Sequence, residues 1–452
     1  MAVAWYTQKK TSSSTVEYGV TASSLDQSAS SPTPPVSYIL LGGYHHVVKL
    51  VRLQPSTRYY YRCGDAHGGW SEVFSFKTAP DDKLTEFSLS IFGDMGYLGS
   101  AERPMKISTD GLVKNWSALP ARQTLEKLKN EGSIDLIWHV GDIGYIDDAF
   151  AHHPVEFTYE KVYNEYMNWI QNLTAVLPYM VSPGNHESEC HSPACIVELR
   201  FNALRNFSAF NKRWHMPSQE SGGVLNMWYS YNYGAVHFVS INTETDFPGA
   251  EETDTGDSHL KFMPAGHFAP NGTYLKWLEA DLKAANESRA NGGPNWIIVG
   301  GHRPHGVVKA CCAAMFEKYG VDMYFNGHAH NYVRSLPSNG VTVERHHKLN
   351  HYHNAQGTVW ITSGAAGSDE TTYVVDVDEA SGKAKPRATN KISKTEFAPG
   401  YTAPVGAEVS DVTTKAMSIG VLTVKNQSML QWKLYSATSG EVLDELSVTK
   451  SS

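Results

Sequence analysis

Two patterns of hydrophobic and polar positions follow one another along the chain. In residues 1–80, short runs alternate buried-type and polar positions with the period of two that is typical of strands, and Ser- and Pro-rich turns such as Ser28–Pro35 separate them. The runs are Met1–Thr7, Thr15–Val20, Val47–Leu53, Tyr59–Cys63 and Val73–Thr78. Short strands at this spacing predict a small all-β sandwich.

The second pattern begins after a polar linker at residues 78–83. Apolar runs that end in glycine and a polar residue alternate with stretches of helix formers such as Ala121–Asn130, which stops before Gly132. The runs are Phe87–Phe92, Ile134–Val140, Val176–Val181, Trp296–Val299 and Val321–Phe325. This alternation predicts an α/β domain, which we expect strands at Met417–Val424, Leu430–Tyr435 and Val442–Val448 to close.

An acidic stretch, Thr243–Pro270, interrupts the second pattern. It carries six carboxylates and no sustained apolar periodicity. We expect a solvated surface loop, because calcium binding of the EF-hand type needs a ligand spacing that is absent here.

The overall charge narrows the class of partner. Thirty-eight Lys and Arg against 46 Asp and Glu give a net charge of −8. A protein that binds nucleic acid or an anionic membrane usually carries a basic bias, and no run approaches the roughly 18 apolar residues of a membrane span. We therefore expect a small-molecule partner and neither nucleic acid nor membrane. An anionic ligand would need a local group of positive charges to bind this acidic protein.

Five short motifs each follow a predicted strand. They are Gly93-Asp94-Met95-Gly96, Gly141-Asp142-Ile143-Gly144-Tyr145, Gly184-Asn185-His186-Glu187, Val299-Gly300-Gly301-His302 and Gly327-His328-Ala329-His330. Loops at the carboxyl ends of strands in an α/β domain meet at one crevice. Seven polar side chains should therefore converge there: Asp94, Asp142, Tyr145, Asn185, His302, His328 and His330.

These seven side chains are suited to metal binding and are too many for one ion. Carboxylate and phenolate oxygens suit a trivalent ion, whereas amide oxygen and imidazole suit a borderline divalent ion. A carboxylate can bridge two ions, and two-metal sites hold their ions about 3.5–4 Å apart. Each motif alone could consist of ordinary turn and core residues, but the five together predict a binuclear metal site.

The motif order DxG, GDxxY, GNHE, VxxH and GHxH resembles that of the purple acid phosphatases in the metallophosphoesterase superfamily, and Tyr145 separates this family from relatives that lack the tyrosine. The resemblance covers nearly the whole chain. It implies a fibronectin type III-like β-sandwich at residues 1–80, N-terminally incomplete, and a catalytic domain at residues 86–452. The implied fold class of that domain is α/β, a two-sheet β-sandwich flanked by helices.

The resemblance also implies the role of each ligand. Asp94, Tyr145 and His330 would bind ferric iron, Asn185, His302 and His328 would bind a divalent ion (Zn, Mn or Fe), Asp142 would bridge the two ions, and His186 would lie beside the substrate. The implied reaction is hydrolysis of phosphate monoesters at acidic pH by in-line attack of a metal hydroxide. Charges of roughly +5 on the ions, −3 on the ligands and −1 on the hydroxide leave about +1, so an acidic protein can bind phosphate locally.

The stretch after the VxxH motif departs from the family pattern. The plant enzymes carry a histidine pair after the VxxH motif, where this chain has Ala310-Cys311-Cys312-Ala313. His305 is the nearest replacement, and we predict that His186 and His305 both act catalytically by donating a proton to the leaving oxygen. The chain has five Cys, and we expect Cys190 and Cys195 to close a small disulfide loop.

Several alternatives remain open. The same site could serve a phosphodiesterase or nucleotide pyrophosphatase, or a non-catalytic phosphate-binding or storage relative, although seven intact ligands argue against the last.

Asn-x-Ser/Thr sites at Asn115, Asn172, Asn206, Asn271, Asn286 and Asn426 favour a secreted, extracellular or vacuolar glycoprotein. No signal peptide is visible, since Met1–Tyr6 already has a strand pattern. A homodimer is compatible with the sequence. We expect the cluster His346, His347, His351 and His353 to lie in a surface loop rather than to bind an adventitious metal.

Overall fold

A computed structural model describes most of the chain. The described residues are 1–39, 42–81, 83–97, 106–107, 112–114, 118–147, 158–188, 203–254, 265–339, 342–368, 372–377, 384–386, 412–414 and 416–451. Cys190 and Cys195, with their predicted disulfide, lie outside these residues. No helix among the described residues is long and apolar enough to cross a membrane.

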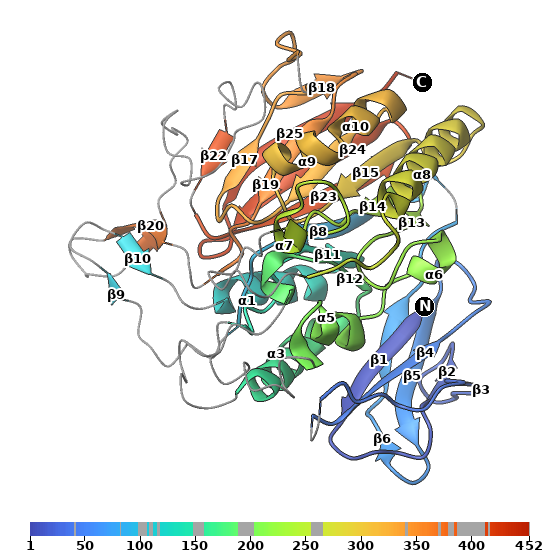
Figure 1. The fold of residues 1–452 in the computed structure, drawn as a ribbon. Coiled ribbons are helices and arrows are strands. Elements are labelled where there is room, and N and C mark those ends of the chain that lie inside the picture. The colour runs from blue at the N-terminus through green and yellow to red at the C-terminus, as the bar shows by residue number, and fades with distance from the viewer. Residues whose placement is uncertain are drawn as a thin grey trace.

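The N-terminal part is all-β, as predicted (Figure 1). Its strands are β1 (Ala2–Thr7), β2 (Thr15–Gly19), β3 (Gln27–Ser30), β4 (Tyr44–Lys49), β5 (Arg58–Asp65), β6 (Gly69–Trp70) and β7 (Phe74–Lys77). β1 pairs with β4, and the others form a five-stranded sheet. Val16, Tyr59 and Phe76 are at most 4% exposed and fill the core between them. Strand β3 was missed, and part of it was assigned to a turn, because its QSAS sequence has no buried position to produce an alternating pattern.

The second part is built on two mixed sheets, which confirms the predicted two-sheet architecture. The first has the order β12-β11-β8-β23-β24-β25-β18 and the second the order β13-β14-β15-β16-β19-β17-β22. The first contains β8 (Phe87–Phe92), β11 (Leu136–Val140), β12 (Tyr179–Ser182), β18 (His351–His353), β23 (Ser418–Asn426), β24 (Met429–Ser436) and β25 (Val442–Thr449). The second contains β13 (Tyr229–Tyr233), β14 (Val236–Ser240), β15 (Trp296–Gly300), β16 (Met323–Asn326), β17 (Tyr332–Arg334), β19 (Val359–Ser363) and β22 (Val412–Thr414).

Large aromatic side chains fill the space between the two sheets. The rings of Trp138 and Phe238 meet edge to face at 5.7 Å, and those of Phe325 and Trp432 lie 5.0 Å apart. Partly exposed and buried residues alternate along the whole of β24, because successive side chains of a strand point to opposite faces of the sheet. All five residues of β15 are buried, because helices cover its second face.

Helices cover the outer faces of the two sheets (Figure 1). α1 (Leu119–Asn130) and α3 (Tyr159–Thr174) pack on the first sheet, and α8 (Thr273–Ala290), α9 (His305–Cys311) and α10 (Ala313–Tyr319) pack on the second. Short elements complete the chain: η2 (Asn185–Glu187), α5 (Ser208–Arg213), α6 (Ser218–Ser221), α7 (Glu251–Asp254), and a small sheet of β9 (Lys106–Ile107), β10 (Leu112–Lys114), β20 (Thr372–Val377) and β21 (Ala384–Pro386).

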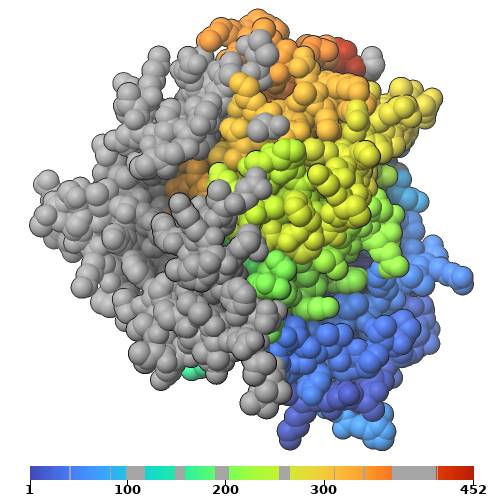
Figure 2. Space-filling model, viewed as in Figure 1, coloured from blue at the N-terminus to red at the C-terminus, as the bar shows by residue number. Residues whose placement is uncertain are grey.

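The N-terminal sheets are anchored on the helical side of the second part. Figure 2 shows the blue N-terminal surface meeting the green segment that contains α5 and α6. At this boundary the buried Arg213 donates to Tyr38 Oη at 2.8 Å and to Glu160 Oε2 at 2.8 Å. Tyr61 Oη donates to the carbonyl of Ala175 at the end of α3. The two parts are therefore joined by buried polar contacts as well as by apolar packing.

Candidate metal centre

The carboxyl ends of parallel strands from both sheets meet at one place. Strands β12, β11 and β8 run parallel in the first sheet, and β14, β15, β16 and β19 run parallel in the second. The first sheet contributes Asp94, Asp142, Tyr145 and Asn185, and the second contributes His302, His328 and His330. The structure thus brings all seven predicted ligands together, divided between two sheets.

One set of donor atoms gathers around the phenol of Tyr145. Tyr145 Oη lies 2.8 Å from His330 Nε2 and 3.1 Å from Asp94 Oδ1, and His330 Nε2 lies 3.2 Å from Asp94 Oδ1. Tyr145 Oη is also 3.4 Å from Asp142 Oδ2. Three oxygens, two of them from carboxylates, and one imidazole form a set that suits a hard trivalent ion.

A second set gathers around the amide oxygen of Asn185. Asn185 Oδ1 lies 3.1 Å from His302 Nε2 and 3.1 Å from His328 Nδ1, and His302 Nε2 lies 2.9 Å from Asp142 Oδ2. Metal bonds of about 2.0–2.2 Å in tetrahedral geometry place donors roughly 3.3–3.6 Å apart. The observed spacings are only a few tenths of an ångström shorter, so these residues fit a borderline divalent ion with little movement.

Asp142 belongs to both sets through the same oxygen, Oδ2. Its other oxygen, Oδ1, accepts the backbone N–H of His186 at 3.0 Å, which fixes the carboxylate plane. Burial opposes ionisation of this side chain, but His302 and His186 hold its pKa below the usual value. An ionised carboxylate at this position is the group that a bridge between two cations requires.

The histidine ligands are oriented by groups behind them. His302 Nδ1 lies 3.0 Å from the carbonyl oxygen of Val140, to which it donates, so Nε2 is left free to face Asn185 and Asp142. Asp94 accepts the backbone N–H of His328 at 2.9 Å. This hydrogen bond links a loop of the first sheet to a loop of the second sheet.

Four of the eleven non-glycine residues with positive φ in the described part of the chain belong to the ligand loops. Asp94, Asp142, Tyr145 and His328 all have φ values between 49° and 65°. This left-handed conformation costs a non-glycine residue about 1–2 kcal/mol and is found where function requires it. The loop containing Gly327 packs so closely on Asp94 that only glycine fits, since a Cβ at this position would lie 2.3 Å from Asp94 Oδ2.

A buried glutamate, Glu187, joins two ligand loops. Its carboxylate accepts the backbone N–H groups of Asp142, Ile143 and Gly184 at 2.8–2.9 Å. The last residue of the GNHE motif therefore positions the bridging Asp142. No role was predicted for Glu187, although its place in the GNHE motif was a signal.

Comparison with known proteins agrees with this centre. Residues 1–78 match the family described as "Purple acid Phosphatase, N-terminal domain", and residues 63–332 match "Calcineurin-like phosphoesterase". Acid phosphatase type 7 of Mus musculus is 30% identical over 79% of this chain and 70% of its own length. The chain belongs to the purple acid phosphatases.

Two further comparisons extend this assignment. An acid phosphatase of Aspergillus ficuum is 27% identical over 90% of this chain and 76% of its own length. The solved structure of the purple acid phosphatase PPD1 from yellow lupin aligns with 99% of this chain and 72% of its own, with a TM-score of 0.65 and 19% identity. The latter likeness concerns the fold, and it agrees with the two-sheet architecture.

His186 borders the open side of this purple acid phosphatase centre. Among the described centre residues, Asn185, His186, His328 and His330 are partly exposed, whereas Asp94, Asp142, Tyr145 and His302 are buried. His186 Nδ1 lies 2.8 Å from Asp147 Oδ2, and Nε2 lies 3.9 Å from Asp142 Oδ2. Its ring packs against Tyr145 at 4.2 Å. Asp147 therefore fixes the imidazole and directs Nε2 toward the centre.

His305 lies in different surroundings. It begins α9, is 3% exposed, and packs edge to face on Trp360 at 4.5 Å. Its Nε2 has no hydrogen-bond partner among the described residues, and burial lowers the pKa of its imidazole to about 4. In the described part of the chain no hydrogen bond, ion pair or ring contact joins it to the seven predicted ligands. Its proton-donor role stays a prediction, which an imidazole that is neutral at mildly acidic pH does not favour.

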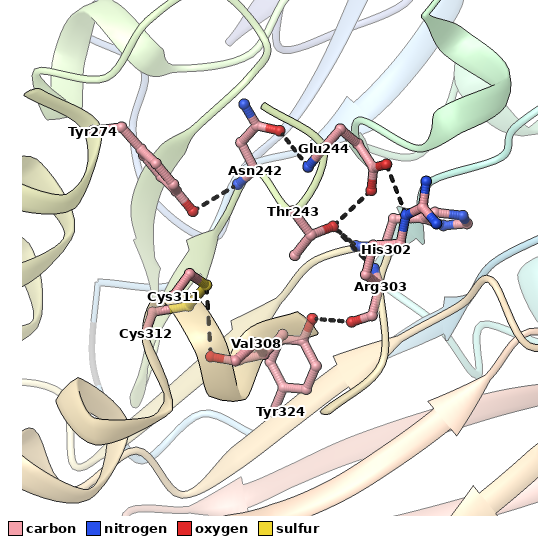
Figure 3. The surroundings of a disulfide bond; sticks show 10 residues. All are labelled: Asn242, Thr243, Glu244, Tyr274, His302, Arg303, Val308, Cys311, Cys312 and Tyr324. Carbon is pink, nitrogen blue, oxygen red and sulfur yellow. Dashed lines mark hydrogen bonds and ion pairs between the residues drawn. A yellow bond between two sulfur atoms is a disulfide. The ribbon is translucent and has the colours of Figure 1, made fainter. Parts of the chain in front are cut away.

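The acidic stretch after β14 is not a solvated loop, so that expectation was wrong for its described residues. Glu244 and Glu252 are at most 1% exposed, and Asp246 is 6% exposed. The reason is Arg303, which is 2% exposed and lies 2.9 Å from Glu244 (Figure 3). It also lies 3.6 Å from Glu252 and 2.7 Å from Glu251. Glu244 and Glu252 are buried because they pair with a buried cation, whereas Glu251 stays partly exposed and Asp246 accepts the backbone N–H of Phe268 at 2.9 Å.

The Arg303 cluster, which consists of Arg303, Glu244, Glu251 and Glu252, lies beside the second donor set. Arg303 Nη1 lies 3.1 Å from His328 Nε2, and Thr243 Oγ1 accepts the backbone N–H groups of His302 and Arg303. Burial raises the pKa of Glu244, and the charge of Arg303 opposes that rise. Figure 3 shows these side chains converging from the two loops.

Removing the buried cation should destabilise the fold. Arg303→Met leaves Glu244 and Glu252 without their counter-ion, and breaking a buried ion pair costs about 3–5 kcal/mol of unfolding free energy. Lys318→Ala is the matched control, because Lys318 and Glu279 are 60% and 44% exposed and such a surface pair contributes about 1 kcal/mol or less. Urea denaturation measures both variants. Equal, small losses would contradict the structural role of the Arg303 cluster.

Cys311 and Cys312, which follow the VxxH motif, are disulfide-bonded. Cys311 and Cys312 close this bond at the junction of α9 and α10 (Figure 3). Cys63 is a free thiol in β5. The pair therefore supplies no imidazole or thiolate to the centre.

Proposed function

We propose that this chain hydrolyses phosphate monoesters at acidic pH on a centre of one ferric and one divalent ion. As a purple acid phosphatase it is an enzyme, and its relatives are acid phosphatases. The observation that carries the proposal is the shared oxygen: Asp142 Oδ2 lies 3.4 Å from Tyr145 Oη in one donor set and 2.9 Å from His302 Nε2 in the other. A carboxylate oxygen shared by both donor sets can bridge two adjacent cations.

The two ions, when bound, would supply a water-derived nucleophile and neutralise charge on the phosphoryl oxygens. Asp94, Tyr145 and His330 would hold the ferric ion, and Asn185, His302 and His328 would hold a zinc, manganese or ferrous ion. The identity of both ions is part of the proposal.

The chain itself would orient the substrate and move a proton. The partly exposed His186, His328 and His330 leave one side of the centre open, and a phosphate ester would enter there. His186 is held through Nδ1 by Asp147, so its Nε2 can donate a proton to the leaving oxygen. Proton donation of this kind typically contributes about 10²–10⁴-fold in rate.

Paired substrates test the reaction class. The metal-loaded protein should hydrolyse para-nitrophenyl phosphate at acidic pH, hydrolyse its bis-ester much more slowly, and lose both activities with a chelator. Faster turnover of the bis-ester would favour a phosphodiesterase. Slow turnover of both esters would favour a phosphate-binding protein.

Replacing the phenol should remove the colour of the iron-loaded protein. A ferric phenolate from Tyr145 absorbs visible light by charge transfer, and Tyr145→Phe deletes only the oxygen that makes this bond. The packing of the ring on His186 is retained, so the fold should survive. We expect the visible band to disappear in this variant. A band that persists unchanged would show that Tyr145 is not an iron ligand.

We further propose that the protein is a secreted or vacuolar glycoprotein. The six Asn-x-Ser/Thr sites support this proposal. Endoglycosidase treatment of protein from its natural source should lower its mass, and an unchanged mass would contradict glycosylation.

A further inference from the structure

A second group of side chains that could hold a metal ion lies outside the binuclear centre, within the histidine cluster that was expected to lie in a surface loop without metal. Glu344, His346 and His347 each offer one donor atom, and all three atoms lie within 4.8 Å of one another. They sit on a turn, because residues 345–347 reverse the chain after the bridge between Ser338 and Val343. A turn places its first and fourth residues side by side, which here are Glu344 and His347.

The turn occupies a crossover between the two large sheets. Strand β17 before it belongs to the sheet that contains β19, and strand β18 after it pairs with β25 in the other sheet. The crossover is held at its end by Arg334, which donates to the carbonyl oxygen of Leu349 at 2.9 Å. A ligand bound at the turn would brace this connection, because Glu344 also accepts the backbone N–H groups of Gln356 and Gly357 beyond β18.

Two of the three donors are already fixed in place. Glu344 Oε1 accepts the backbone N–H groups of Gln356 and Gly357, so Oε2 is directed at His347 Nε2, 2.8 Å away. The side chain of His347 is only 3% exposed and packs on Tyr352 at 5.5 Å. Such preorganisation lowers the entropy that a bound ion would otherwise remove.

The third donor lies at the solvent side of this pair. His346 is exposed, and its ring centroid is 4.2 Å from that of His347. Two imidazoles and a carboxylate are the donor set of a three-ligand zinc site with a fourth position open to water. An ordinary ion pair between Glu344 and His347 needs no second imidazole beside it.

We propose that Glu344, His346 and His347 bind one zinc ion and that this ion clamps the crossover between the sheets. Binding requires the Nε2 proton of His347 to leave or to move to Nδ1. In the described part of the chain Nδ1 accepts one hydrogen bond, from the backbone N–H of His353 at 3.4 Å. This distance is longer than that of a good hydrogen bond, so little is lost when the proton moves to Nδ1.

Counting bound zinc tests the proposal. Protein whose binuclear centre is already filled is dialysed against Zn²⁺, and bound metal is measured per chain. We expect one further zinc ion on the wild type, with affinity reduced at least about 10-fold in His346→Ala and in Glu344→Gln. Zinc should also raise the melting temperature of the wild type and leave that of both variants nearly unchanged.

A neighbouring histidine provides the control. His351 is exposed on β18 and bonds to Thr449 Oγ1, so His351→Ala should keep the further ion. Phosphatase activity without added zinc should be the same in His346→Ala and in the wild type, which separates this site from the binuclear centre. The proposal is overturned if the wild type binds no further ion, if either His346→Ala or Glu344→Gln keeps it, or if His351→Ala loses it.

Discussion

Asp142→Asn is expected to release both ions and to reduce phosphatase activity to background. Its Oδ2 is the only donor atom common to the two sets, and an amide cannot bridge two cations as a carboxylate does. Metal stabilisation of the transition state is worth several kcal/mol, so the loss in kcat/KM should be at least about 10³-fold. Asn also tolerates the left-handed backbone at this position, where φ is 49°. Metal analysis and activity of the same sample measure the effect.

A ligand of one set alone is the matched control. Asn185→Ala removes a donor from the divalent set and leaves Asp94, Tyr145 and His330 untouched. We expect this variant to lose the divalent ion and to keep iron and the visible band. If Asp142→Asn retains either ion at full occupancy, Asp142 is not the bridge.

His186→Ala is expected to lower kcat by about 10²–10⁴-fold on alkyl phosphates while both ions stay bound. An alkoxide is a poor leaving group and needs the proton that Nε2 would donate, whereas para-nitrophenolate leaves without much help. The loss on para-nitrophenyl phosphate should therefore be smaller. Asp147→Asn, which weakens the contact to His186 Nδ1, should also lower kcat on both substrates, but by a smaller factor.

The ratio of the two losses identifies the role of each histidine. Equal losses on both substrates for His186→Ala would show that His186 positions phosphate and does not protonate the leaving oxygen. For His305→Ala, a larger loss on alkyl phosphates would support the predicted proton donor. Equal losses with a lower melting temperature would assign His305 to packing, which its burial against Trp360 favours.

The ligand set could be predicted because strand ends are local features of a sequence. Each ligand lies within a few residues of an apolar run, and parallel strands deliver such loops to one edge. The structure brings Asp142 and His302 together although they are far apart in the chain and belong to separate motifs. Their chemistry, a carboxylate between oxygen donors and imidazoles, was visible in the residue types.

The groups behind the ligands could not be predicted in the same way. Whether Glu244 is solvated or buried depends on Arg303, which lies 59 residues away in the chain and is adjacent to it only in the fold. His305 has the spacing of a site residue, yet α9 turns it toward Trp360. Strand β3 carries no alternating pattern because neither of its faces is buried. In each case the deciding partner comes from another part of the chain.

The central claim is that one chain holds a ferric ion and a divalent ion on a shared carboxylate oxygen. Metal analysis of the purified protein, recorded with its visible spectrum, tests it most directly. We predict about one iron and one divalent ion per chain, with a charge-transfer band from Tyr145. A single ion per chain, or two ions without a visible band in the oxidised iron-loaded protein, would contradict the account.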